Sequence, residues 1–495
     1  MNAATKQTNP SAPWTKEKLT QLFEQSADVQ IQMNLLDAEP SSEIMLIYAD
    51  GLCDTSQLGD VILPSLQQLY CESEWSRLHK GGCLGTLPLV PLTREAPAQE
   101  IMDSVYQGDL LLYLTQPGLL MKLNISSPPR RVPQESSTEI SIKGPKDGFV
   151  EDITVNVALI RKRIRSNTLC YETMILGRRT RTKTGLMYIR DIIDPLLVEE
   201  VRKRINKIDV DGIYSVAQLE ELLGDVKYTL FPLLDFTGRP DFVVAALLAG
   251  RFVILVDGNP FVLIGPAGFS LILKSPEDIH FNFQYISFAR LIRLFSFWLS
   301  ILLPGFWVAI VAFHQDQVPF RLMATVAVAR IGLPFSGQME MFILLVLLEI
   351  FREAGVRLPS SIGQILTVVG GLVIGDAAIR SGLVSPSVVV VGAITAVTGA
   401  TLVNQTLSTV VSIVRLGIFL ICCILGMYGF ILSLILLLFY MSKLTSFGVP
   451  YFAPLSPPIF KDMLKSFLRA PWSLMRKRPA VLHVQDKDHQ GEDNP

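Results

Sequence analysis

The sequence contains few of the residues and patterns on which enzymes rely. Histidine occurs only five times in 495 residues, and no two histidines have the spacing that would place two metal ligands on one face of a helix. The phosphate-binding pattern Gly-x-x-x-x-Gly-Lys and the nucleophile pattern Gly-x-Ser-x-Gly are both absent. The six cysteines show neither metal-ligand spacing nor the framework of a secreted domain. We therefore expect a protein that is not an enzyme and that holds no metal and no cofactor.

Two further absences concern location and nucleic acid. The amino-terminal stretch contains no apolar run of signal-peptide length, so we expect this region to remain in the cytosol. The formal net charge of −1 gives no sign of a nucleic-acid partner. A basic cluster at residues 178–183 contains no interleaved aromatic residues, so attraction to anionic headgroups or a solvated surface explains it better. We expect contact with membrane lipid and no nucleic-acid partner.

The amino-terminal half alternates short apolar runs with amphipathic stretches, which predicts an α/β fold. We expect strands at residues 44–48, 110–114, 139–143, 174–176 and 186–189, and a hairpin formed by residues 251–256 and 261–264. One helix has an apolar stripe from Ile153 to Ile164 and carries Arg161, Lys162, Arg163 and Arg165 on its other face. Capping signals predict two more helices, which begin at Asp194-Pro195 and at Ser215.

A polar, proline-rich run at residues 126–137 cannot build a core and predicts a linker. The expected domains are two cytosolic α/β subdomains at 1–130 and 131–289, a transmembrane helical domain at 290–442 and a cytoplasmic tail at 443–495. Apolar residues between Ile459 and Trp472, flanked by basic residues, predict a helix in that tail that lies on the membrane surface.

Apolar runs of bilayer-spanning length follow one another between Leu291 and Tyr440. We expect full spans at residues 291–313, 362–379, 388–403 and 413–440. The segment 320–349 instead consists of two shorter apolar pieces, separated by a stretch that includes Pro334 and Gly337, and it predicts a broken or re-entrant helix. Lipid tolerates such a break only beside protein or water, so Pro334 and Gly337 are candidate permeation residues.

Basic residues before the first span and in the tail place both ends of this domain in the cytoplasm, which requires an even number of crossings. Four spans with a re-entrant hairpin satisfy this rule, and so do six spans. Glu340 and Glu349 bound an apolar piece and are expected to mark its solvated ends.

Small and charged residues lie in the span predicted at residues 362–379 and directly after it. Gly371 and Gly375 permit close approach between helices, which by itself indicates a tight bundle. Asp376 and Arg380 stand one helical turn apart. Ionisable residues inside a membrane usually face the bundle interior or a water-filled path, so the two form either a structural pair or part of an ion path. All four residues are pore or gating candidates.

Polar residues also lie in the span predicted at residues 388–403 and directly after it. Thr395, Thr398, Leu402 and Gln405 are expected to share one helical face, on which three residues carry hydroxyl or amide groups. Threonine hydroxyls can also bond to the preceding helical turn, which is a purely structural explanation for both threonines. We include Thr395, Thr398 and Gln405 among the pore candidates.

Several strings are specific enough to indicate a family. They are residues 143–152 leading to 160–165, residues 238–241 leading to 254–261, Pro334-Phe335, and Arg469-Ala470-Pro471-Trp472. These strings resemble the A subunits of GerA-type germinant receptors from spore-forming bacteria, and the resemblance covers roughly residues 137–479. It implies a subunit of the spore inner membrane that works with a transporter-like B subunit and a lipoprotein C subunit.

The resemblance further implies that A subunits form a homo-oligomer. In this interpretation the oligomer is a ligand-gated ion channel that releases cations to start germination. A secondary transporter is the first alternative, although transporters usually show paired repeats with matching discontinuous helices. A structural scaffold, with the B subunit as the conductor, is the second.

Overall fold

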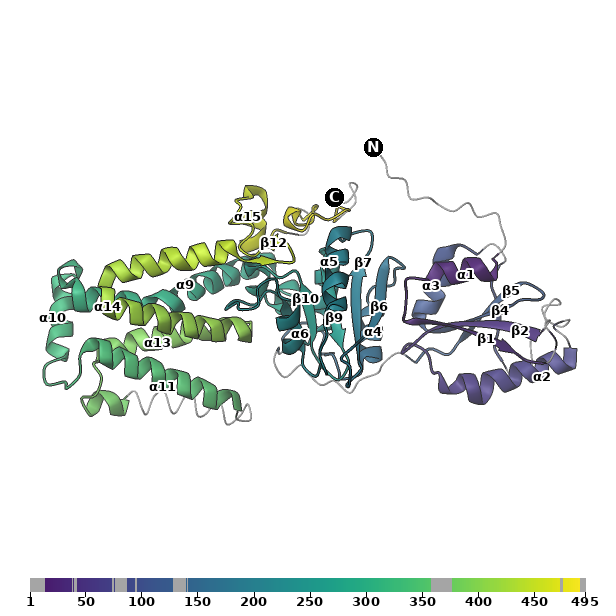
Figure 1. Ribbon diagram of the computed structural model, residues 1–495, viewed down its shortest axis with the longest axis horizontal. Coiled ribbons are helices and arrows are strands. Elements are labelled where there is room, and N and C mark those ends of the chain that lie inside the picture. The colour runs from purple at the N-terminus through teal and green to yellow at the C-terminus, as the bar shows by residue number, and fades with distance from the viewer. Residues whose placement is uncertain are drawn as a thin grey trace. The chain divides into compact units, whose positions relative to one another are not determined.

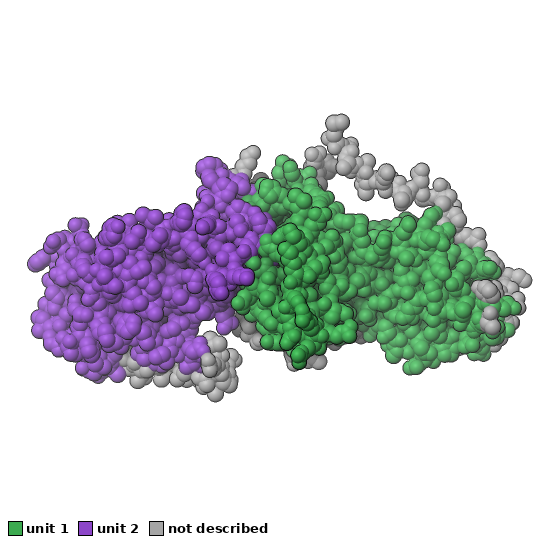
Figure 2. All heavy atoms as spheres, viewed as in Figure 1, with its two compact units in different colours: residues 1–224, 234–266, 475–495 green, residues 225–233, 267–474 purple. Residues whose placement is uncertain are grey.

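The computed structural model describes most of the chain. The described residues are 14–37, 39, 42–73, 75, 87–93, 96–127, 139, 141–357, 376–471 and 475–489. They fold into two compact units, which Figure 2 shows in two colours. Unit 1 comprises residues 1–224, 234–266 and 475–495, and unit 2 comprises residues 225–233 and 267–474. The chain therefore leaves unit 1, builds most of unit 2 and then returns to unit 1.

The first sheet of unit 1 is antiparallel, in the order β1-β2-β4-β5-β3 (Figure 1). Its strands are β1 Val29–Leu35, β2 Glu43–Ala49, β3 Val90–Pro91, β4 Asp109–Leu114 and β5 Leu119–Asn124. The predicted strands at 44–48 and 110–114 are confirmed as β2 and β4, which pair directly. All residues of β4 are buried, so this strand appears in the sequence as a continuous apolar run.

Helices cover both faces of this sheet. They are α1 Lys16–Phe23, a π-helical turn Leu58–Ile62 that leads into α2 Leu63–Ser73, and α3 Ala98–Gln107. Met45 and Ile47 of β2 pack with α1 and α3 in one core, whereas Ile44 and Leu46 pack with the π-helical turn and α2 in another. The alternation of side chains along a strand produces this division.

The second sheet of unit 1 is also antiparallel, in the order β6-β7-β9-β10-β8. Its strands are β6 Leu169–Leu176, β7 Thr182–Ile189, β8 Asp235–Thr237, β9 Phe252–Val256 and β10 Val262–Gly265. The helices beside it are α4 Ile153–Arg161, α5 Pro195–Asn206, α6 Val216–Leu223 and α7 Pro240–Leu248. The predicted hairpin is confirmed as β9 and β10, and the other predicted strands at 174–176 and 186–189 lie within β6 and β7.

Capping side chains define two of the predicted helix starts. Asp194 accepts a hydrogen bond from Leu196 N at 3.0 Å where α5 begins. Ser215 accepts one from Ala217 N at 3.2 Å where α6 begins. Both contacts satisfy an amide that the first turn of a helix leaves without a partner.

The strand predicted at residues 139–143 is wrong. Glu139 and residues 141–143 form bends and irregular backbone. The Glu139 carboxylate accepts hydrogen bonds from Thr237 Oγ1 at 2.6 Å and from Gly238 N at 3.2 Å. Burial raises the pKa of this carboxyl group. A side-chain contact, rather than a strand ladder, therefore connects Glu139 to the end of β8.

Arg161 ends α4 and is fully buried, so the prediction that it lies on the charged face opposite the apolar stripe is wrong. Its Nε and Nη2 atoms donate to the Asp28 carboxylate, each at 2.8 Å. Its Nη1 atom donates to the carbonyl oxygens of Ser166 at 3.1 Å and Leu169 at 3.0 Å. The guanidinium carbon lies 4.4 Å from the centre of the Tyr106 ring. Because Asp28 and Tyr106 belong to the part built on the first sheet, Arg161 joins the two sheets.

Residues 475–489 return to unit 1 and bind there. Arg478 Nε donates to Leu248 O at 2.9 Å, and Gln485 N donates to Ile192 O at 2.9 Å. Val484 is buried against Gly250, which has a φ of +92°. We call residues 475–489 the carboxyl-terminal strap.

Unit 2 is helical. Its helices are α8 Phe269–Ile272, α9 Phe283–Phe313, α10 Phe320–Ala329, α11 Gly337–Arg357, α13 Pro386–Ala400, α14 Gln405–Lys443 and α15 Phe460–Phe467, with a short hairpin of β11 Thr445–Ser446 and β12 Val449–Pro450. Among the described residues, α9 and α14 are long and apolar enough to cross a membrane. The helices predicted at 291–313 and 388–403 correspond to α9 and α13. Most of the helix predicted at 362–379 lies outside the described residues, which resume at Asp376.

α14 reverses direction at Gly426, where φ is +59° and ψ is −136°. Before the reversal, Cys422 lies against Gly305 of α9. After it, Phe430 returns to the same level of α9, where its ring lies 5.3 Å from that of Phe306. Figure 1 shows the two limbs of α14 side by side. We call residues 405–425 the first limb and residues 427–443 the second limb.

The single uninterrupted span predicted at 413–440 is therefore wrong. A Cβ atom on Gly426 would stand 2.8 Å from Cγ of Phe313, and only glycine adopts its φ and ψ without strain. At 1.5 Å per residue the limbs measure about 32 and 26 Å, so each approaches the thickness of a hydrocarbon core on its own.

The remaining contacts fix the direction of each helix. Gln338 Nε2 at the start of α11 donates to Cys423 O at 3.3 Å, and Arg352 Nη1 near its end donates to Ser408 O at 3.1 Å. α11 therefore runs antiparallel to the first limb of α14. α13 begins beside the start of α11 and runs parallel to it. The common core contains Val308, Met341, Leu344, Leu345, Val384, Val388, Val391 and Phe419.

Candidate functional site

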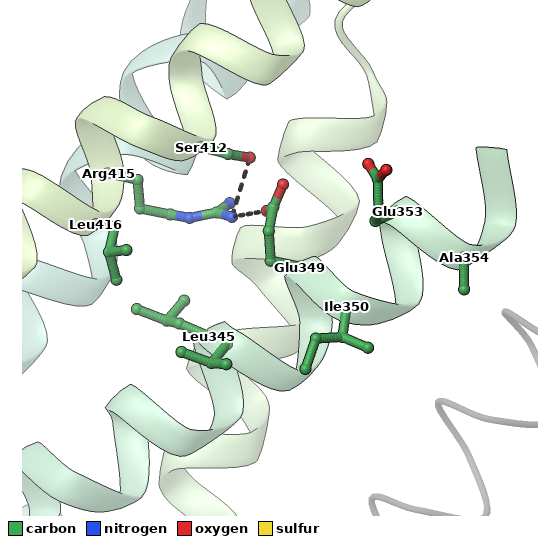
Figure 3. A pocket seen from close by; sticks show the side chains of 9 residues that line it. Leu345, Glu349, Ile350, Glu353, Ala354, Ser412, Arg415 and Leu416 are labelled. Carbon is green, nitrogen blue, oxygen red and sulfur yellow. Dashed lines mark hydrogen bonds and ion pairs between the residues drawn. The ribbon is translucent and has the colours of Figure 1, made fainter. Parts of the chain in front are cut away.

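A cavity of about 620 Å³ lies between α11 and the first limb of α14 (Figure 3). It is lined by Leu345, Val346, Glu349, Ile350, Glu353 and Ala354 of α11, and by Ser412, Arg415 and Leu416 of α14. The α11 positions share one helical face because they recur at intervals of one and four residues. Apolar walls with a few convergent polar groups are typical of a binding or transport site.

Arg415 provides the buried positive charge of this cavity, and its side chain is only 9% exposed. Its Nη2 atom donates to Glu349 Oε2 at 3.2 Å and to Ser412 Oγ at 3.2 Å. Figure 3 shows the guanidinium reaching from α14 toward the Glu349 carboxylate on α11. The side chain of Glu349 is 44% exposed, so this carboxylate is accessible although its partner is not.

A second guanidinium approaches the same carboxylate. Arg352 Nη2 lies 3.7 Å from Glu349 Oε1 and donates to Thr409 Oγ1 at 3.1 Å. Arg352 Nη1 also donates to Ser412 Oγ. Glu349 and Ser412 are therefore each shared between two arginines, and the four side chains form one network across α11 and α14.

The network lies well inside the apolar part of the helices. Ile418 and Cys422, which follow Arg415 by about one and two turns, lie against Gly305 of α9. Gly305 itself lies in the apolar stretch that begins at Leu291. Charged side chains at such depth are costly in lipid, so they normally face protein or a water-filled cavity.

The break predicted between two apolar pieces is confirmed, because α10 ends at Ala329 and α11 begins at Gly337. However, α11 continues to Arg357 and is longer than the predicted piece. Glu340 was expected at a solvated end, but it is fully buried. Its Oε2 atom accepts a hydrogen bond from Ser385 N at 2.9 Å, and its Oε1 atom lies 3.6 Å from Arg330 Nε. Glu340 therefore joins the broken segment to the start of α13, where the helix dipole favours a negative charge.

The structure places the charged candidates outside the cavity. Asp376 and Arg380 form an ion pair with an Oδ2–Nε distance of 2.7 Å, and both side chains are largely exposed in the single chain. Gly371 and Gly375 lie outside the described residues. Pro334 lies in the break between α10 and α11, and Gly337 begins α11 beside the guanidinium of Arg330.

The threonine candidates bond to their own helix. Thr395 Oγ1 donates to Val391 O at 2.8 Å, and Thr398 Oγ1 donates to Ile394 O at 2.8 Å. The expected common face with Gln405 is wrong, because α13 ends at Ala400 and Gln405 begins the next helix. The signal for the turn between the two helices was Asn404, whose side chain accepts a hydrogen bond from Leu407 N at 2.9 Å and caps α14.

Sequence reasoning missed Arg415 and Arg352, which supply the positive charges of the network. The available signal was a lone arginine within the apolar stretch after Gln405, because such residues usually mark a functional or paired site. Glu349 was noticed only as the end of an apolar piece. Its partner lies 66 residues away, so the spacing alone does not connect the two.

Unit 1 presents different electrostatics. Arg178 and Arg179 of the basic cluster pair with Asp209 and Asp211 at the surface, so part of the cluster's charge is already balanced. Glu220 in α6 is half-buried, and burial raises its pKa to about 7. These surface pairs do not form a site comparable with the cavity of unit 2.

Comparison with known proteins covers nearly the whole chain. The family model described as Bacillus/Clostridium GerA spore germination protein matches residues 17–481. Spore germination protein XA of Bacillus anthracis is 40% identical, over 95% of this chain and 96% of its own length. Spore germination protein KA of Bacillus subtilis is 34% identical, over 94% of this chain and 86% of its own.

Two further similarities concern a membrane protein and a solved structure. The uncharacterized membrane protein YfkQ of Bacillus subtilis is 33% identical, over 96% of this chain and 91% of its own length. The solved structure is the crystal structure of the N-terminal domain of the A subunit of the Bacillus megaterium spore germinant receptor GerK3. Its sequence is 30% identical to this chain, the TM-score is 0.39, and the match covers 51% of this chain and 94% of that one. The resemblance found in the sequence is confirmed by the family match: this chain belongs to the Bacillus/Clostridium GerA family of spore germination proteins.

Proposed function

We propose that this protein is the membrane subunit of a nutrient germinant receptor in bacterial spores, and that its copies assemble into a ligand-gated channel that releases cations. In this proposal it crosses the spore inner membrane several times and works with a transporter-like B subunit and a lipoprotein C subunit. Membership of a spore germination family supports the role in germination. The name of the relative YfkQ, a membrane protein, supports the location.

The observation that carries the channel proposal is the charged cavity between α11 and α14. Charges buried in apolar helices are costly unless protein or water surrounds them. Here a half-exposed carboxylate, Glu349, and the guanidinium of Arg415 line a cavity of about 620 Å³, and a second guanidinium, Arg352, lies beside the same carboxylate. A space of this size admits several water molecules between polar partners. A wet, charged cavity among apolar helices is what ion conduction requires.

Connectivity supports the proposed orientation. The chain leaves unit 1 after residue 266, and the carboxyl-terminal strap binds unit 1 again through Arg478 and Gln485. A folded soluble unit lies on one side of a membrane, so residues 267–474 cross it an even number of times. With basic residues flanking the helices, unit 1 belongs on the cytoplasmic side.

The pore residues predicted from the sequence belong to this proposal. We expect a bulky substitution at Gly371 or Gly375, or removal of the charge at Asp376, to alter ion release without preventing membrane insertion. Release kinetics equal to those of the unchanged protein, in normally assembled variants at all three positions, would remove these residues from the path.

The decisive experiment is reconstitution of this chain with its B and C subunits in potassium-loaded liposomes. A mixture of amino acids, sugars and nucleosides serves as the nutrient, and a potassium electrode measures release. We expect nutrient-dependent potassium efflux, and a closed ring of this chain after detergent extraction. Saturable, counterflow-capable uptake of one solute would instead identify a transporter. Equal efflux from liposomes that hold only the B and C subunits would identify this chain as a scaffold.

A further inference from the structure

We propose that the Glu349–Arg415 pair sets the ion selectivity of the conduit. Glu349 contacts the passing monovalent cation, and Arg415 is a positioning residue that holds the carboxylate and moderates its attraction for that cation. This inference rests on the proposed function, because a selectivity element has meaning only where ions pass.

Exposure assigns different roles to the two partners. The Glu349 side chain is 44% exposed and lines the cavity, whereas Arg415 is 9% exposed. Figure 3 shows Glu353 extending from the next turn of α11 beside Glu349. An ion in the cavity therefore reaches the carboxylate of Glu349 more readily than the guanidinium of Arg415. Carboxylate oxygens are suitable ligands for hard cations, and acidic side chains provide the selectivity of many cation channels.

Arg415 is held in place from its own helix. Its Nη2 atom donates to Ser412 Oγ, three residues earlier on α14, as well as to Glu349. Ser412 also accepts from Arg352. The two arginines and the serine thus form a fixed frame, and Glu349 is the most exposed of the three network members that line the cavity.

Pairing explains why such a carboxylate need not trap an ion. Conduction requires a site that attracts an ion strongly enough to admit it and weakly enough to release it. An isolated carboxylate at low dielectric would hold a cation tightly, because charges interact strongly there. Two guanidiniums, 3.2 and 3.7 Å from the two Glu349 oxygens, reduce that attraction.

A purely structural ion pair predicts a different behaviour. Its removal would change stability or assembly but would not change which ions pass. The relevant measurement is therefore the potassium-to-chloride permeability ratio, obtained from the reversal potential of the reconstituted receptor in a planar bilayer with a potassium chloride gradient. Glu349→Gln alone would leave the buried Arg415 without its carboxylate partner, so the main variant is the double neutral substitution Glu349→Gln with Arg415→Gln.

We expect the double variant to assemble and its permeability ratio to fall by about tenfold, since the carboxylate no longer attracts cations. Arg415→Gln alone is expected to retain the cation preference and to saturate at a lower potassium concentration, because Glu349 then binds cations more tightly. Asp209→Asn is the matched control. It removes a carboxylate from an exposed ion pair in unit 1 and is expected to leave the ratio unchanged.

An unchanged ratio in the double variant, with potassium release intact, would overturn this inference and leave the proposed function standing. Absence of potassium release from the unsubstituted receptor would overturn both. If the double variant does not assemble, Glu349→Asp decides the matter, because it keeps the charge and shortens the side chain. A retained cation preference with altered conductance supports the inference, and unaltered conductance opposes it.

Discussion

Removal of the Arg161 guanidinium tests whether a buried ion pair joins the two sheets of unit 1. In the variant Arg161→Met, Asp28 keeps a carboxylate that is only 5% exposed but loses both hydrogen bonds from Arg161. Removing one partner of a buried pair typically costs about 3–5 kcal/mol, because the remaining charge has no compensation. We expect the free energy of unfolding of unit 1 to fall by that amount.

The double variant Asp28→Asn with Arg161→Met separates the cost of leaving Asp28 unpaired from the net contribution of the ion pair to stability. It removes both charges, and replacing a whole buried pair is often nearly neutral. We therefore expect the double variant to be more stable than Arg161→Met alone by about 2 kcal/mol or more. The carbonyl oxygens of Ser166 and Leu169 lose their donor in both variants, so their contribution cancels in the comparison.

Pulse proteolysis in increasing urea provides the assay, applied to the full-length protein in detergent and read from the fragments of unit 1. Arg178→Met is the control, because Arg178 and Asp209 form a pair that is mostly exposed, and solvent-exposed pairs contribute little to stability. If Arg161→Met is no more sensitive to protease than Arg178→Met, the buried pair does not hold the sheets together.

Three other variants test separate features. Glu220→Gln removes a carboxyl group whose pKa rises from 4.5 to about 7 in the fold. Because of this raised pKa, the unsubstituted protein loses stability as the pH rises from about 4.5 to 7. Thermal melts should therefore show the variant more stable than the unsubstituted protein at pH 8, by at most about 3 kcal/mol, and equally stable at pH 4. Gly426→Ala places a Cβ atom beside Phe313 at a residue with a left-handed φ, and the backbone strain alone should lower stability by about 1–3 kcal/mol. The control Gly417→Ala, at a position with open space, should not lower stability. Equal melting temperatures of the two variants would contradict the reversal at Gly426. Glu340→Ala should destabilise unit 2 by about 2–4 kcal/mol. Glu340→Gln should destabilise it by less, because glutamine can still accept the hydrogen bond from Ser385 N. Equal losses of stability for the two variants, measured by thermal melting in detergent, would show that this hydrogen bond is unimportant.

Features with local causes were predictable from the sequence. The caps at Asp194 and Ser215 act within two residues, and the hairpin of β9 and β10 is set by its turn. The burial of Arg161 was not predictable in this way. Its neighbours Lys162, Arg163 and Arg165 suggest a solvated face, and Asp28 lies 133 residues away. Only the tertiary fold brings the two charges together.

The candidate site, too, was predictable only where its features have local causes in the sequence. Hydropathy located the helical region and the break before α11, because apolar length and helix-breaking residues are local signals. It could not show that α14 reverses at Gly426, since an apolar hairpin and one long apolar helix have similar composition. It also could not pair Glu349 with Arg415, because their contact depends on the antiparallel packing of α11 and α14.

The carboxyl-terminal strap has a consequence for biosynthesis. Residues 475–489 leave the ribosome after all the helices of unit 2, yet Val484 fills the space beside Gly250 and Gln485 bonds to Ile192. Unit 1 therefore cannot finish folding until the helices of unit 2 and the strap have been synthesised. A chain that stops before the strap leaves this surface open, which gives quality-control proteases a direct way to recognise incomplete subunits.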